Sequence, residues 1–189
     1  MAHFPKPLRD HSHDTDNGSS ARPAEDAGNL TKVHIDLPNH WWFKGESLWA
    51  KPLGGDLYEI HNIPFCAYGL NCKDVVRATA ASPDLKPEIR EIVRRSGNRT
   101  LRLFFIADEP DPQAQRPCLA ELEAMDAWVE RANPRVVCVN ANPTADYAGI
   151  CEYLAKLEAA GVLEYETCEE RSPGSFDDLP GGDEDEDDR

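Results

Sequence analysis

The sequence predicts an α+β fold, in which an antiparallel β-hairpin or small-barrel half is followed by a β-α-β-α-β half in one compact unit with disordered ends. Three observations predict it. Short segments with alternating apolar residues and turn signals fill residues 32–106, which is typical of β structure. Residues 107–168 alternate apolar strands with patterns of helical spacing. Both ends of the chain are polar and rich in charge.

The two ends limit the folded part of the chain. Of the 189 residues, 40% are hydrophobic, and the formal net charge is −15. Residues 1–31 carry almost no aliphatic side chains, so we expect a disordered leader. Residues 169–189 carry ten acidic residues and two arginines, so we expect a disordered acidic tail. A single domain is therefore expected over residues 32–168, mainly β in 32–106 and α/β in 107–168.

The first elements are strands. Residues 32–38 (KVHIDLP) alternate apolar and polar side chains, as a half-buried strand does. Residues 47–53 and 57–64 flank Gly54-Gly55-Asp56, which predicts an antiparallel hairpin. In this hairpin Trp49 lies on the face opposite Leu48. A fourth strand is expected over residues 74–80 (DVVRATA).

The stretch between these strands, HNIPFCAYGLNCKD at residues 61–74, contains a histidine and two cysteines. Pro64 ends the preceding strand because it lacks an N–H group. Cys66 and Cys72 are six residues apart, a spacing that fits no common zinc pattern, and no C-x-x-C pair occurs in the chain. We therefore expect a connection rather than a metal site, and six structural cysteines. A nucleophilic Cys72 activated by His61 stays open as an alternative.

Residues 87–96 fit either a helix that starts at Pro87 or a strand. The turn residues Ser96-Gly97-Asn98 and the alternation over residues 100–105 favour a hairpin with its tip near Gly97. Four arginines cluster around this tip: Arg94, Arg95, Arg99 and Arg102. They form either a charged edge that discourages aggregation or a receptor for an anion or carboxylate.

The sequence of residues 107–168 predicts two helices and two further strands. A helix that starts at Pro117 carries the stripe Leu119, Leu122, Met125 and Val129, with Trp128 beside it. Residues 135–141 form a continuous apolar strand that is buried on both faces. A second helix is capped at residues 142–144 and ends at Gly161. Residues 162–168 supply the last strand, and right-handed crossovers bring these strands onto one sheet.

Several segments carry a resemblance to a known family. The segments ESLWA (46–50), NIPF (62–65), DVV (74–76) and SGN (96–98) resemble Domain of Unknown Function 4265, an uncharacterised bacterial family, and the resemblance covers residues 32–168. It implies a stand-alone bacterial module and favours the strand over residues 88–95. It brings no activity, because none is established for the family. Asn71-Cys72-Lys73 departs from the family pattern, in which a Gly adjoins the Asp.

Charge and motifs limit the function. A net charge of −15 argues against nucleic acid as a partner, and no apolar run is long enough to cross a membrane, so we expect a cytoplasmic protein. No common catalytic, phosphate-binding or dinucleotide motif occurs, and we expect no cofactor and no metal.

The first hypothesis is a non-catalytic module that binds, and neutralises or regulates, a basic protein. Its anchors include exposed aromatic residues at Trp41, Trp42 and Trp49. The candidate binding residues are Trp49, Asn62, Phe65, Arg94, Arg95, Asn98, Arg99 and Arg102. A sensor of a small anionic ligand that uses the arginines of residues 94–102 is the first alternative. A Cys/His enzyme of unknown reaction is the second, and the oligomeric state is left open.

Overall fold

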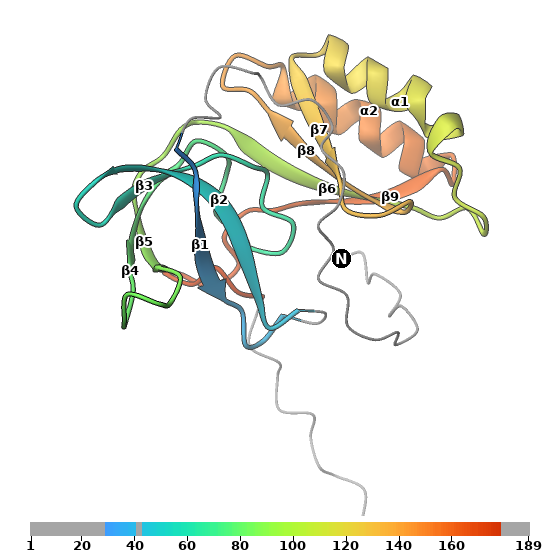
Figure 1. The fold of residues 1–189 in the computed structure, drawn as a ribbon. Helices are drawn as coiled ribbons and strands as arrows, with labels where there is room; N and C mark the ends of the chain where they lie inside the picture. The colour runs from blue at the N-terminus through green and yellow to red at the C-terminus, as the bar shows by residue number, and fades with distance from the viewer. Residues whose placement is uncertain (1–28, 41–42, 179–189) are drawn as a thin grey trace, which may run out of the picture.

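The computed structural model describes residues 29–40 and 43–178, which form a closed β-barrel and a four-stranded sheet. Figure 1 shows two helices on one face of this sheet and the barrel on the side away from the helices. The predicted α+β class is confirmed, and the first half is built from strands as expected.

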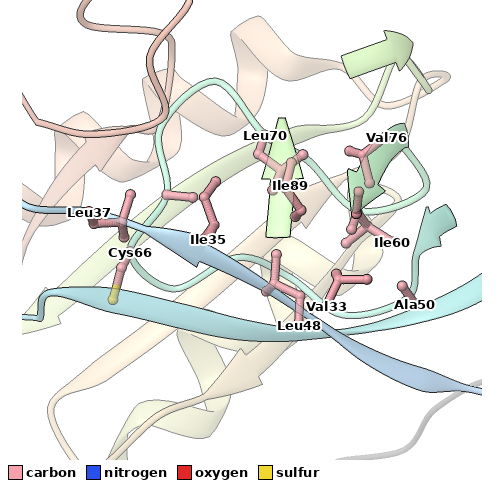
Figure 2. Packing of buried hydrophobic residues seen from close by; sticks show 12 residues of the cluster. Val33, Ile35, Leu37, Leu48, Ala50, Ile60, Cys66, Leu70, Val76 and Ile89 are labelled. Atoms are coloured by element: carbon pink, nitrogen blue, oxygen red, sulfur yellow. The ribbon is translucent and has the colours of Figure 1, made fainter. Parts of the chain in front are cut away.

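Five strands close the barrel in chain order: β1 (Thr31–Asp36), β2 (Gly45–Gly54), β3 (Leu57–Ile60), β4 (Val75–Thr79) and β5 (Glu88–Arg94). Consecutive strands pair antiparallel, and β1 pairs with β5 in parallel to close the barrel. The predicted strand pattern and the turn at Gly54-Gly55 are confirmed. Figure 2 shows the apolar side chains that fill the barrel, among them Val33, Ile35, Leu48, Ile60, Val76 and Ile89.

The second half contains β6 (Arg99–Phe105), α1 (Pro112–Ala124), β7 (Ala127–Arg131), β8 (Val136–Ala141), α2 (Tyr147–Ala159) and β9 (Leu163–Thr167). The strand order is β7-β8-β6-β9, and every pair is antiparallel. This β-α-β-β-α-β arrangement is ferredoxin-like. Strand β8 lies inside the sheet and is buried on both faces, as predicted. Between the sheet and the two helices lies a second hydrophobic core, the helix-side core, which includes Leu101, Leu103, Leu122, Val139, Ile150 and Leu154.

The hairpin predicted over residues 88–105 is wrong, although both of its arms are strands. Strand β5 pairs with β4 and β1, whereas β6 pairs with β8 and β9. The turn near Gly97 carries the chain from the barrel into the sheet. It is held by the backbone N–H of Ser96, which donates to Asp74 Oδ1 at 2.7 Å. Local turn signals therefore located the turn but not the partners of its two arms.

The limits of the first helix also differ from the prediction. The helix begins at Pro112, with Asp111 as its N-cap, and ends at Ala124. Asp126 has a φ of 63° and reverses the chain into strand β7, so Trp128 and Val129 lie in a strand. The apolar spacing of the helix continues by coincidence into this strand. The second half accordingly has one strand more than expected.

Helix α2 starts later than predicted and ends as predicted. Its N-cap is Asp146, which accepts a hydrogen bond from the backbone N–H of Gly149 at 3.0 Å. The helix ends just before Gly161, whose φ is 70°.

The connection over residues 61–74 is largely buried against the barrel, and charged side chains bind its backbone. Glu46 accepts hydrogen bonds from the N–H groups of Phe65, Cys66 and Ala67 at 2.6, 2.9 and 3.1 Å. Arg102 Nη2 donates to the carbonyl of Cys66 at 3.0 Å. These partners satisfy the polar groups that a buried loop would otherwise leave without hydrogen bonds.

The packed region extends ten residues beyond the boundary expected at Cys168. Phe176 packs against the barrel core, and its carbonyl accepts from the N–H of Tyr68 at 2.8 Å. Asp177 is 3% exposed and accepts from the N–H of Asn39 at 2.6 Å. Residues 169–178, which we call the strap, therefore belong to the folded domain. Residues 1–28 of the expected leader and residues 179–189 of the expected tail lie outside the described residues.

Candidate functional site

A groove with a volume of about 680 Å³ lies beside the start of α1. Four carboxylate residues line it: Asp108, Glu109, Asp111 and Glu121. Among the described residues that line it, none is a lysine or arginine. Its apolar lining includes Ile106 and Val162, which are 38% and 39% exposed. We call this surface the acidic groove.

Local sequence explains how the acidic groove forms. The loop of residues 106–111 follows β6 and ends at the N-cap Asp111, whose side chain accepts from the N–H of Gln113 at 2.9 Å. Arg135 Nη1 donates to the carbonyl of Ala107, and its Nη2 donates to the carbonyl of Asp108, both at 2.6 Å. The guanidinium therefore holds the loop backbone, while the loop carboxylates Asp108 and Glu109 line the groove.

The four arginines predicted to cluster near Gly97 do not form one surface. Arg94, Arg95 and Arg99 are exposed, whereas Arg102 is only 6% exposed. Arg95 and Arg99 line a second groove of about 410 Å³, together with Asn98 and two acidic residues, Glu169 and Glu170. Arg99 stacks on the ring of Tyr147 at 4.4 Å, and Arg95 lies 3.7 Å from Asp74. This groove carries both signs of charge.

Arg102 instead joins the sheet to the buried connection. Its Nη1 lies 2.9 Å from Glu166 and donates to the Tyr68 hydroxyl at 3.3 Å, and its Nε donates to Cys168 Sγ at 3.1 Å. Two guanidiniums contact the Tyr68 ring, with Arg102 at 4.3 Å and Arg171 of the strap at 4.0 Å from its centre. Arg171 also pairs with Glu166. Arg102 is thus a structural cation inside the protein.

The comparisons with known proteins agree with this architecture. The sequence model described as Domain of unknown function (DUF4265) matches residues 46–165. The chain belongs to the DUF4265 family. The comparison with curated proteins gives no match.

A solved structure shares the fold of this DUF4265 protein. It is described as "Novel crystal structure of a hypothetical protein from Neisseria gonorrhoeae". The TM-score is 0.61 at 18% sequence identity, over 74% of this chain and 95% of that chain. At this identity the similarity concerns the fold alone.

The remaining candidate binding residues of the DUF4265 chain have structural contacts. Asn62 Oδ1 accepts from the N–H of Trp49 at 2.8 Å, which ties the end of β3 to β2. Phe65 packs against the barrel core. Asn98 Nδ2 donates to the carbonyl of Cys72 at 3.1 Å. Trp49 is 39% exposed, with Lys32 Nζ 4.9 Å from its ring, whereas Trp41 and Trp42 lie outside the described residues.

The thiols of the connection are buried rather than activated. Burial raises the pKa of Cys72 to about 12, and burial and the nearby Glu46 raise that of Cys66. Cys72 Sγ contacts the carbonyl of Ile60 at 3.7 Å. His61 Nε2 lies 3.0 Å from Glu59 and 3.1 Å from Lys73 Nζ. A nucleophilic thiol has a lowered pKa, so this environment opposes a Cys72 nucleophile.

Two further observations concern metals and membranes. Within residues 29–40 and 43–178, no group of three or more His, Cys, Asp or Glu side chains is arranged to hold a metal ion. The same residues contain no helix with the length and apolar character needed to cross a membrane.

Sequence reasoning missed the acidic groove. The loop was recognisable as acidic and proline-rich, but Glu121 lies on α1 and Tyr153 on α2, and only the packing of the helices brings them to the loop. The signal that could have found the groove is the succession of Asp108, Glu109 and Asp111 directly before a helix.

Proposed function

We propose that the protein is a non-catalytic binding module of the bacterial cytoplasm that neutralises or regulates a basic protein, and that the acidic groove is its binding surface. The observation that carries the proposal is the lining of this groove, which has four carboxylate residues and, among its described members, no basic residue. Such a surface accelerates encounter with cations and disfavours anions.

The apolar lining supports a protein partner. Ile106 and Val162, which line the groove, are partly exposed, and Tyr153 also belongs to its lining. Interfaces combine apolar and aromatic contacts with charged residues, since apolar burial contributes affinity and charge contributes specificity. A basic segment with apolar neighbours complements this combination. The net charge of −15 adds long-range attraction for the same partner.

The alternative functions have weaker support. A receptor for a small anion would use Arg95 and Arg99, but Glu169 and Glu170 line the same groove and repel an anion. A Cys/His enzyme would need a reactive thiol, and burial raises the pKa of Cys72 to about 12.

The proposal is tested by changing charge in two places by the same amount. The groove variant carries Asp108→Asn, Glu109→Gln and Glu121→Gln, and it leaves Asp111 in place because Asp111 caps α1. The control carries Asp56→Asn, Asp84→Asn and Glu91→Gln, which replace exposed carboxylates of the barrel half. Both variants remove three negative charges. The probe is a fluorescently labelled twelve-residue peptide of alternating lysine, arginine and leucine. Its affinity for each variant is measured by fluorescence anisotropy at several salt concentrations.

We expect the groove variant to lose about tenfold or more in affinity, and the control to lose about threefold or less, because direct contacts outweigh the general field. Added salt should weaken binding by the natural protein and by the control. Deletion of residues 179–189 should leave most of the affinity, because all four carboxylate residues named in the lining stay in place. Equal losses in the two triple variants would refute the groove as the binding surface.

A further inference from the structure

We infer that the acidic groove receives an arginine side chain of the partner, with Gln115 as a hydrogen-bond acceptor and the Tyr153 ring as a stacking surface. The inference rests on the proposed function and names the chemical group that the groove selects. Lysine and arginine carry the same charge, so the carboxylates alone do not distinguish them. The choice between them depends on the neutral groups of the lining.

Gln115 is the first of these groups. It belongs to the lining of the groove, yet the residue is only 5% exposed. Its Nε2 donates to the carbonyl of Pro134 at 2.9 Å, which fixes the orientation of the amide because a flip would bring two oxygens together. The remaining oxygen, Oε1, is buried and accepts no hydrogen bond from any described residue.

A buried acceptor without a donor is unfavourable, and such groups in folded proteins are normally satisfied by protein, water or a ligand. The carboxylates around the groove indicate that this donor is cationic. A guanidinium has five N–H groups in a planar fork, so it can donate to an amide oxygen and to a carboxylate at the same time. An ammonium group is a compact, strongly hydrated charge that gives up its water less readily.

Tyr153 is the second group. It lies on α2, lines the groove, and packs partly against the helix-side core. Burial, with further effects of Cys118 and Glu121, raises its pKa, so the phenol stays neutral near pH 7. Aromatic rings attract cations over their faces, and the planar guanidinium also stacks on them. Glu121 on α1 and Asp108 on the loop supply carboxylates in the same lining.

The test compares two peptides on the full-length protein, six arginines against six lysines, by fluorescence anisotropy at low salt. The natural protein should bind the arginine peptide about tenfold more tightly, which corresponds to about 1.4 kcal/mol. Gln115→Met removes the acceptor at similar volume and should reduce this preference to about twofold or less. The matched control is Gln113→Met, because Gln113 lies two residues away on α1, is exposed and does not line the groove.

A second variant covers the case in which Gln115→Met lowers stability. Tyr153→Leu keeps an apolar side chain on α2 and removes the ring, and it should also reduce the preference for arginine. Thermal unfolding of each variant shows whether a change in binding follows a loss of structure. Retention of the arginine preference in both variants would overturn the inference and would leave water as the donor to Gln115.

The outcomes separate this inference from the proposed function. If the natural protein binds the two peptides equally and the groove variant binds neither, the groove is a binding surface for basic partners but does not select arginine. Binding of neither peptide would refute both. A preference for arginine that disappears with Gln115→Met and survives Gln113→Met would support both.

Discussion

Removal of the buried Arg102 guanidinium should destabilise the protein strongly. Its Nη2 and Nε donate to Cys66 O at 3.0 Å and to Cys168 Sγ at 3.1 Å, and its Nη1 pairs with Glu166 at 2.9 Å. Arg102→Met keeps much of the apolar stem but leaves the Cys66 carbonyl and the Tyr68 hydroxyl without this donor. Truncation of one partner in a buried ion pair costs about 3–5 kcal/mol. Because Glu166 still pairs with Arg171 in this variant, we expect the free energy of unfolding to fall by about 3 kcal/mol, the lower end of this range.

The assay is urea denaturation at pH 7, followed by circular dichroism. The control is Arg90→Met, the same substitution at an arginine that is 52% exposed and pairs with Glu88 on the surface. Surface ion pairs contribute about 0–1 kcal/mol, so this control should change the free energy of unfolding by less than about 1 kcal/mol. Equal effects of the two substitutions would refute the interpretation of Arg102 as the cation that joins the two halves.

Three further predictions follow from the buried groups and one backbone turn. Burial, and to a smaller extent the positive charge of Arg102, lower the pKa of His40 to about 4. Between about pH 6.5 and pH 4, His40 is therefore protonated in the unfolded chain and neutral in the folded protein. Stability should therefore fall as the pH drops through this window, and urea titrations should show about 2–3 kcal/mol more loss from pH 7 to 4.5 than in His40→Asn. Gly69 has a φ of 68°, and an added Cβ would lie 3.0 Å from the Cβ of Glu170, so Gly69→Ala should cost more than Gly55→Ala, whose φ is 58° and whose Cβ meets open space. We expect the free energy of unfolding to fall by about 2 kcal/mol in Gly69→Ala and by about 1 kcal/mol in Gly55→Ala. Equal melting temperatures of the two variants would contradict the close contact at Gly69. Iodoacetamide at pH 8 should label Cys118 and Cys151, which are partly exposed, well before the buried Cys72, as mass spectrometry of peptides can measure. Early labelling of Cys72 would contradict its burial.

Much of the fold was predictable because local chemistry determines it. The alternation around Val33 and Ile35 and the glycine turn at Gly54-Gly55 specify strands and a hairpin without reference to the rest of the chain. The end of α2 is likewise set by Gly161, whose positive φ is a local property.

The errors arose where distant residues decide the outcome. The two arms beside Gly97 satisfy every local rule for a hairpin, yet each arm finds better partners in a different sheet. Trp128 and Val129 continue a helical spacing, although the helix ends before them and Asp126 reverses the chain with a positive φ. Asp adopts positive φ more often than most residues, but it also occurs in many other conformations, so its presence does not predict a turn.

The candidate site was less predictable than the fold. Arg102 is close in sequence to three exposed arginines, and it is buried because the connection over residues 61–74 packs against its face of β6 through Cys66 and Tyr68. Trp49 was correctly expected on the outer face of its strand, because that inference needs only the period of two. The acidic groove depends on the packing of α1 and α2 against a loop, which no short segment of sequence encodes.

The contacts of the buried connection also have a consequence for synthesis on the ribosome. The barrel strands are translated first, but Tyr68 needs Arg102 from β6 and the carbonyl of Phe176 from the strap. Phe176 leaves the ribosome about a hundred residues after Tyr68. The buried connection can therefore complete these contacts only after residue 176 has left the ribosome.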